Sequence, residues 1–315
     1  EASRAAALGA QRVALGRGVA LELLGSGQAA RWESPGAVRL ADVEADRLGF
    51  YGSPLEAGRG ESDRVLAQVA VVKEREGDLE IAAYGALRRL VLEENFTGYL
   101  ADEERGDRRR QRQSGGTAGV RASYERDLEL PLPARLLGGL GWQLDAGDQS
   151  ERRVDARGVA GATSRDLEAR VHALHATFGA RLSPWCWLEL LPSVRGDLFV
   201  YRARDVLEDR RGEQVLGAVS PRAAVRFPVH ARLVLFADYG RGLRSPEARA
   251  VTAPAPSTVE DEALDQYTGG RPEVAVADAA EVGLELSPAG WIQIGAAAFG
   301  TWIEREVIFD HVSNT

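Results

Sequence analysis

Two histidines three residues apart, His172 and His175, form an H-x-x-H pattern that binds a metal ion when a helix brings both rings together. The surrounding residues alternate with the two-residue period of a strand, so that side chains three apart point to opposite faces. The sequence offers no convincing third ligand nearby. It therefore predicts no metal site at these histidines.

Other groups that could do chemistry also lack the pattern that the chemistry needs. Glu260, Asp261, Glu262 and Asp265 are acidic, but they do not have the spacing of an EF-hand calcium loop and we interpret them as a solvated loop. The sequence contains no G-x-S-x-G or S-x-x-K motif. The G-S-G-Q-A-A segment at Gly25 lacks the lysine of a phosphate-binding loop. We expect no catalytic residue, no cofactor and no enzyme.

The composition of the chain limits the classes of protein to which it could belong. The formal net charge of -8 and a pI near 5.3 argue against a general nucleic-acid binder. No apolar run approaches eighteen residues, so the sequence predicts no transmembrane helix. Cys186 is the only cysteine, so no disulfide can form within the chain. The chain begins at Glu1 and contains no Met, and we expect it to be an internal piece of a longer precursor.

The segment from Ser220 to Glu247 predicts two strands joined by a tight turn. The second strand places one set of side chains on one face (Ala231, Leu233, Leu235, Ala237 and Tyr239) and the other set opposite (Arg232, Val234, Phe236 and Asp238). The turn is expected at 227–230, where Pro228 interrupts the hydrogen-bond ladder. After Tyr239 the periodicity disappears for about thirty residues, which predicts a long loop.

The same unit occurs about six times, which predicts about twelve strands of ~9–11 residues each. Short turns are expected at 16–18, 76–78, 130–133, 181–184, 227–230 and 287–290. Long polar loops are expected at 25–63, 91–116 and 145–165, and the charge run of residues 102–113 is interpreted as part of a solvated loop.

Strict alternation of short turns with long loops is typical of an outer-membrane barrel and is not required of a soluble β-sandwich. Aromatic residues near strand ends fit the girdle of such a barrel, although a sandwich core would use them equally well (Trp142, Trp185, Trp187, Phe227, Tyr239, Trp291 and Trp302).

Several short motifs, taken in order, resemble the TonB-dependent outer-membrane receptors. The residues that carry the resemblance are Pro221 and Arg222, then Gly242, Arg244 and Pro246, and then Glu281 and Gly283. Val194-Arg195-Gly196-Asp197 resembles the R-x-D element of the preceding hairpin, and Ile308-Phe309-Asp310 resembles a later aromatic-rich strand end. The resemblance covers most of the chain from about Val19 onward.

The resemblance implies an all-β fold, a transmembrane antiparallel up-and-down β-barrel. About twelve strands are roughly half of a plugged transporter barrel of about 22 strands. We therefore expect residues 1–315 to be a partial barrel domain. Neither the plug domain nor the TonB box of the family is visible in this chain, and the usual C-terminal strand ending in an aromatic residue is also missing.

The resemblance also implies a function in the outer membrane of a Gram-negative bacterium. This is TonB-dependent uptake of a scarce ligand such as a ferric siderophore, cobalamin or a glycan. The implied partners are the TonB energy-transducing complex, a small ligand such as a metal chelate, and outer-membrane lipid, with no nucleic acid. The alternatives are a passive porin or channel, and a soluble all-β ligand-binding module.

Recognition is expected in the long loops. Aromatic and amide groups in loops suit ligand contact, which selects Asn95, Phe96, Tyr99 and Tyr267 as candidate ligand-binding residues. Arg222, Arg244 and Glu281 are expected to brace the inner wall of the barrel.

Overall fold

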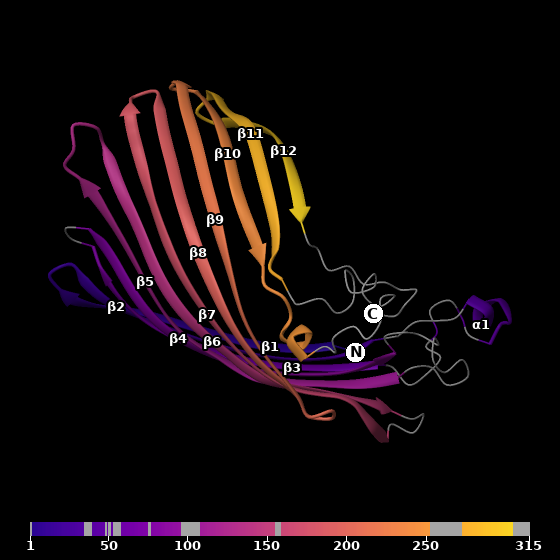
Figure 1. Ribbon diagram of the computed structural model, residues 1–315. Coiled ribbons are helices and arrows are strands. Elements are labelled where there is room, and N and C mark those ends of the chain that lie inside the picture. Colours follow the sequence, from indigo (N-terminus) through magenta and orange to yellow (C-terminus); the bar gives the residue numbers. More distant parts are fainter. Residues whose placement is uncertain are drawn as a thin grey trace, which may run out of the picture.

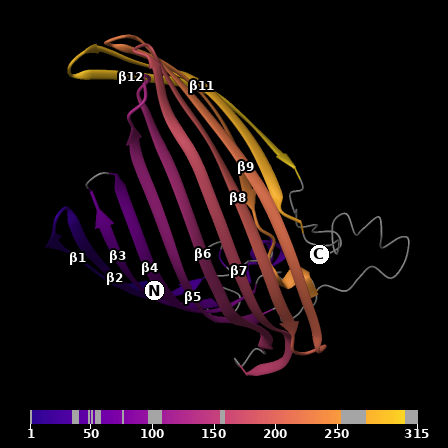
Figure 2. The same cartoon turned by 60° about the vertical axis from the view of Figure 1, so that its left-hand side comes forward.

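The twelve strands in the described residues of the chain lie in one sheet. In the computed structural model they pair antiparallel in chain order, β1 to β12, without a crossover. Figures 1 and 2 show a single curved layer with β1 at one edge and β12 at the other. The structure describes residues 2–34, 40–47, 49, 52, 58–74, 77–95, 108–154, 159–252 and 273–304. This order confirms the predicted antiparallel up-and-down architecture.

The strands are long. They are β1 (Ala2–Gly16), β2 (Val19–Ser34), β3 (Gly58–Lys73), β4 (Asp78–Asn95), β5 (Arg108–Leu128), β6 (Ala134–Val154), β7 (Ala160–Trp185), β8 (Leu188–Asp205), β9 (Arg210–His230), β10 (Leu233–Arg244), β11 (Ala275–Ala289) and β12 (Ile292–Glu304). Two short helices, α1 (Leu40–Glu44) and η1 (Ala248–Thr252), follow β2 and β10. No helix in the described part of the chain is long and apolar enough to cross a membrane.

The predicted strand length of ~9–11 residues is wrong. The strands run from 12 residues in β10 to 26 in β7. Much of the sequence expected to be loop is therefore strand: β2 continues to Ser34, β4 to Asn95 and β6 to Val154, and β5 already begins at Arg108. The error has a physical cause. At the ends of β2, β5 and β6 polar side chains lie on both faces, and in β4 the apolar residues Leu90, Val91 and Leu92 are consecutive, so hydrophobic alternation vanishes although backbone pairing continues.

Three predicted turns begin before the observed ones, although the turn predicted at 287–290 overlaps the observed turn at Gly290. β7 extends to Trp185, β9 to His230 and β11 to Ala289, and the turns follow them at 186–187, 231–232 and 290–291. Pro184, Pro228 and Pro288 each lie beside a register shift in the ladder. Proline can stay in a strand at a bulge because no ladder hydrogen bond is required of it there. The turns predicted at 16–18 and 130–133 agree with the structure.

The two faces of the sheet differ in chemistry. The short orange coil of Figure 1, η1, lies in the hollow of the sheet, and its Ala248 and Val251 pack against Phe199 and Tyr201 of β8. Odd-numbered residues of β8 therefore face the concave side. Strand pairing extends this assignment across the sheet and leaves exposed aliphatic side chains on the convex side (Val69, Ile81, Val120, Leu174, Leu198, Val219, Leu235 and Val282).

Aromatic rings lie over glycines on the concave face, where they take the space that a Cβ atom would need. The pairs are Trp32 over Gly60, Tyr84 over Gly119, His175 over Gly141 and Phe236 over Gly283. A Cβ atom on Gly119 would lie 2.5 Å from Cζ of Tyr84 and 2.9 Å from the carbonyl oxygen of Trp142. These glycines are needed because a ring occupies the space of their missing side chain.

We predict that Gly119→Ala lowers the free energy of unfolding by about 1–3 kcal/mol, because Tyr84 must leave its position across the glycine. Gly196→Ala is the matched control, since nothing lies within 4 Å of a Cβ atom at Gly196. Urea unfolding of the intact protein in detergent gives both values. Equal stability of the two variants would contradict the role assigned to the ring on the glycine.

Candidate functional site

The two ends of the sheet are built differently, and the end with long connections carries the two buried carboxylates, Glu93 and Glu151. Short turns close β1–β2, β7–β8 and β11–β12 at one end, where the exposed rings of Trp185 and Trp187 stack at 5.1 Å and 3°. At the other end β4 finishes at Asn95 and β5 starts at Arg108. The long-connection end is therefore the candidate recognition end, as expected for binding loops on a rigid scaffold.

Only one of the four candidate ligand-binding residues is within the described chain. Asn95 is the last residue of β4 and is partly buried. Phe96, Tyr99 and Tyr267 lie outside the described residues, as do the acidic residues of 260–265. The structure therefore fixes where the polypeptide of the 96–107 segment leaves the sheet, and the ligand contacts stay a prediction.

The residues of the family motifs form part of the wall. Pro221 and Arg222 are successive residues of β9 and so point to opposite faces. The aliphatic part of Arg222 approaches Gly240, where a Cβ atom would lie 3.5 Å from its Cγ. Glu281 and Gly283 share the concave face of β11, and Gly283 lies under the ring of Phe236.

The remaining motif residues lie where β10 leads toward η1. Gly242 and Arg244 are in the last residues of β10, paired with Ala277 and Ala275 of β11. Pro246 follows the strand, and its carbonyl oxygen accepts a hydrogen bond of 3.3 Å from the hydroxyl of Tyr201. This contact helps hold the chain after β10 against the concave face of β8.

The other predicted motif, Val194-Arg195-Gly196-Asp197, forms a local ion pair on the concave face. Arg195 donates from Nε and Nη2 to the carboxylate of Asp197 at 2.7–3.0 Å. His175 faces the same side, opposite Asp197 in the ladder, whereas His172 faces the convex side and stacks on Trp142. Among the described residues no group of His, Cys, Asp and Glu could hold a metal ion.

A polar track that the sequence prediction missed crosses the concave wall of β4, β5 and β6. The hydroxyl of Tyr84 donates to Oε1 of Gln143 at 2.7 Å, and Nε2 of Gln143 donates to Asp145 at 2.6 Å. Thr117 donates to the same carboxylate at 2.5 Å. The sequence did carry a signal for this track. Gln143 and Asp145 alternate with the apolar residues Trp142 and Leu144, which indicates a polar face of the strand.

Farther toward the long-connection end, Glu151 forms a buried cluster on the concave face. It is 5% exposed and accepts hydrogen bonds from Arg109 Nη1 at 2.5 Å and Gln111 Nε2 at 3.1 Å. Burial opposes ionisation of the carboxyl, but these hydrogen bonds and the charge of Arg109 outweigh it and lower the pKa of Glu151. The carboxylate links β5 to β6 at their polar ends.

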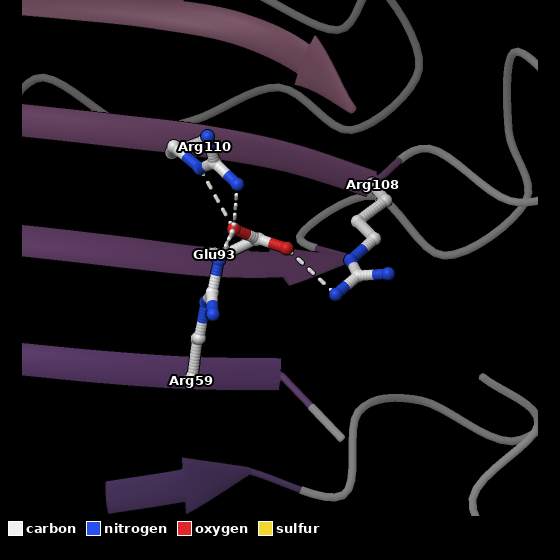
Figure 3. Close-up of polar contacts among 4 residues, drawn as sticks. All are labelled: Arg59, Glu93, Arg108 and Arg110. Carbon is white, nitrogen blue, oxygen red and sulfur yellow. Dashed lines mark hydrogen bonds and ion pairs between the residues drawn. The ribbon is translucent and has the colours of Figure 1, made fainter. Parts of the chain in front are cut away.

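Glu93 is the centre of a second cluster on the convex face (Figure 3). Its Oε2 accepts hydrogen bonds from Arg110 at 2.7 Å and Arg59 at 3.1 Å, and its Oε1 lies 2.6 Å from Nη2 of Arg108. The Glu93 side chain is almost fully buried, whereas that of Arg59 is 59% exposed. One carboxylate therefore joins three adjacent strands.

The ionisation of Glu93 follows from its partners. Burial favours the neutral acid, but the hydrogen bonds and charges of the three arginines outweigh burial and hold the pKa of the carboxyl below its ordinary value. The prediction that residues 102–113 are solvated loop is wrong from Arg108 onward, because this carboxylate and the ladder to β4 keep Arg108 and Arg110 in the sheet.

Comparison with known proteins gives a consistent result. A family model described as TonB dependent receptor-like, beta-barrel matches residues 28–315. No curated protein matches the sequence.

Solved structures with a similar fold share little sequence with the chain. The unliganded ferric citrate transporter FecA has a TM-score of 0.79 at 13% identity, over 95% of this chain and 43% of that one. The siderophore receptor PiuA from Acinetobacter baumannii has a TM-score of 0.75 at 10% identity, over 95% of this chain and 49% of that one. The ferric-catecholate import receptor Fiu from K12 E. coli has a TM-score of 0.71 at 9% identity, over 100% of this chain and 53% of that one. The chain thus spans about half the length of these structures.

We predict that Glu93→Gln destabilises the ends of β3, β4 and β5, by roughly 1–3 kcal/mol at neutral pH, because three guanidinium groups lose their charged acceptor. The folded pKa of Glu93 is lowered, so its contribution is present above the unfolded pKa of about 4.3 and is lost as pH falls through the folded value. Amide hydrogen exchange of β4 and β5 measured across acidic pH tests both statements.

The control for this prediction is Glu80→Gln on the same strand. Glu80 is 36% exposed and makes one ion pair of 3.0 Å with Arg121, so we expect a change of at most about 1 kcal/mol. If Glu93→Gln and Glu80→Gln shift exchange equally, or if Glu93→Gln keeps the acid dependence of the wild type, Glu93 does not join these strands as described.

Proposed function

The chain belongs to the TonB-dependent receptor-like β-barrel family, and from this premise we propose that it forms part of the barrel of an outer-membrane receptor for active uptake of a scarce ligand. The observation that carries the proposal is the up-and-down sheet of twelve strands, which has an exposed aliphatic zone on its convex face and hydrogen-bonded polar side chains on its concave face. Such a sheet suits lipid on one side and an aqueous interior on the other.

A soluble all-β module needs a second layer against the aliphatic face, because a large exposed apolar surface is unfavourable in water. The twelve strands form one sheet, and within the described residues no second sheet covers the convex face. Leu235 and Val282 are 39% and 58% exposed there. This favours a lipid-facing surface over a sandwich core.

The class of ligand that we propose is a metal chelate. The solved structures with this fold include proteins named as receptors or transporters for ferric citrate, ferric preacinetobactin and ferric yersiniabactin. The concave wall offers amide, hydroxyl and carboxylate groups from Gln143, Thr117 and Asp145 along the path. In this proposal the loops bind the chelate outside, and TonB, acting on a plug, opens the interior to it.

We predict that a strain expressing the complete protein accumulates radiolabelled iron from one of a panel of ferric chelates at low concentration. The panel comprises a citrate, a catecholate and a hydroxamate complex. Accumulation should require the receptor gene, the proton-motive force and TonB, since energy is needed to move the plug. Uptake that persists unchanged without TonB would instead support a passive porin.

We also predict that alanine at Asn95, Phe96, Tyr99 or Tyr267 weakens chelate binding, by roughly tenfold for a residue that contacts ligand directly. Equilibrium binding to the purified complete receptor measures the effect. Phe178→Ala is the control, because this exposed aromatic residue lies on the convex face of β7. Unchanged affinity in all four loop variants would remove these residues from the binding site.

A further inference from the structure

The chain that follows β10 turns into the hollow of the sheet. β10 pairs with β9 only as far as Gly240, opposite Arg222, whereas β9 extends beyond this pair to Arg210. η1 contacts β7, β8 and β9, and Figure 1 shows it on the concave side of the sheet, beyond the end of β10. The chain therefore enters the interior of the curved sheet at this point instead of continuing along its edge.

η1 covers a buried apolar cluster on the concave face, which we call the Tyr201 seat. Tyr201 is its most buried member, at 1% exposed, and Phe199 beside it is 9% exposed. Val274, immediately before β11, belongs to the same cluster. The wall contributes further side chains from β7 and β9, and η1 packs on them with two residues (Val171, Ala173, Leu216 and Ala218 from the wall; Ala248 and Val251 from η1). The chain thus meets one part of the wall both after it leaves β10 and before it enters β11.

Two close contacts hold η1 and the residues before it on this seat. The hydroxyl of Tyr201 donates to the carbonyl oxygen of Pro246 at 3.3 Å. At Gly212 of β9 the backbone of η1 comes so close that a Cβ atom would lie 2.0 Å from the carbonyl oxygen of Val251 and 2.8 Å from its Cγ1. Only glycine leaves room for this approach. The position of η1 therefore depends on Gly212 as well as on Tyr201.

The apolar character of the seat requires a cover. Elsewhere the concave face carries hydrogen-bonded polar groups such as Gln143 and Asp145, whereas Phe199 and Leu216 would face water if η1 left the wall. Exposing apolar side chains to water is unfavourable. η1 is thus held on the wall without help from a ligand, in contrast to binding loops, which are drawn from the least stable parts of a protein.

A helical turn on the wall narrows the space beside it. A helix with its side chains is roughly 10 Å across, so η1 takes about that thickness from the interior next to β8 and β9. A solute that moves along this part of the concave wall passes only if it fits into the remaining width.

We propose that residues 246–252 form an inner strap, fixed on the Tyr201 seat, which sets an upper size limit for the ligand. The strap determines specificity by its bulk, and Tyr201 and Gly212 are positioning residues that hold it without contacting the ligand. This inference rests on the proposed uptake function, because a size limit matters only for a solute that passes through the interior. It adds selection by size to the recognition expected of the loops.

The first test measures whether the strap is fixed. Amide hydrogen exchange of residues 246–252 is compared in the complete protein in detergent; the amide of Ala250, which bonds to the carbonyl oxygen of Glu247 at 3.0 Å, reports on η1. We expect exchange roughly tenfold faster in Gly212→Ala, because a Cβ atom displaces η1, and roughly threefold faster in Tyr201→Phe, which loses one hydrogen bond. Gly196→Ala on β8 is the matched control and should exchange like the wild type, since nothing lies within 4 Å of a Cβ atom there.

Two results of this test would overturn the strap. The first is equal exchange in the wild type and Gly212→Ala, or equal acceleration in Gly196→Ala. The second is a response to ligand. Saturating ferric citrate, ferric catecholate or ferric hydroxamate should leave the exchange of residues 246–252 in the wild type within about twofold, and a larger change means that the segment moves with the ligand.

The second test measures the size limit. Cells that express the complete protein receive either a ferric chelate that the wild type accumulates or the same chelate carrying a bulky fluorophore, and the ratio of the two uptake rates is recorded. We expect the wild type to favour the unmodified chelate, Gly212→Ala to lower this preference roughly threefold, and Gly196→Ala to leave it unchanged. The same preference in all three proteins would contradict the size limit.

The two tests separate this inference from the proposed function. If the wild type accumulates no chelate through TonB, the proposed function fails and the size limit fails with it, whereas the exchange data still decide whether η1 is fixed. If uptake requires TonB but the preference is the same in Gly212→Ala, only the size limit is wrong. Outer-membrane fractionation checks that each variant is inserted, and Tyr201→Phe takes the place of Gly212→Ala in the uptake test if the latter is not.

Discussion

The hydrogen-bond ladder between successive strands is the constraint on which the rest of the structure depends. A backbone amide facing hydrocarbon has no water to bond, so each strand needs a neighbour on both sides. Twelve strands in chain order satisfy this for all but the outer edges of β1 and β12. The period of two follows from the same ladder and separates the side chains of the convex face from those of the concave face. Every cluster described above lies where that alternation places it.

The sequence predicted this architecture well because its signals are local. Alternation along 233–239 and turn residues at 16–18 or 130–133 report directly on pairing between adjacent strands. Strand length was underestimated because β4 and β5 continue past the aliphatic zone, where hydrophobicity no longer alternates. The turns near Pro184, Pro228 and Pro288 were misplaced because bulges accept the prolines within strands. Proline marks an interruption of the ladder, and only the structure tells whether the chain reverses there.

The charged clusters could not be predicted in the same way, because they join residues far apart in the sequence. Glu93 meets Arg59 from 34 residues away, and Glu151 meets Arg109 from 42. One signal was nevertheless present. Arg110 and Arg112 alternate with Gln111 and Gln113, which indicates a strand face at the end of what looked like a solvated charge run. The loop residues predicted to contact ligand were chosen by residue type alone. Strand pairing places Asn95 among them, and the other three lie outside the described residues.

The packing of rings over glycines couples the shape of the concave surface to residues that have no side chain. Tyr84 and Phe236 reach Gly119 and Gly283 on the neighbouring strands, where no Cβ atom stands in the way. At these points the surface of the wall is made by a ring from the next strand. A substitution that adds a Cβ atom at such a glycine would therefore displace a neighbouring ring and change the concave surface one strand away from the substituted residue.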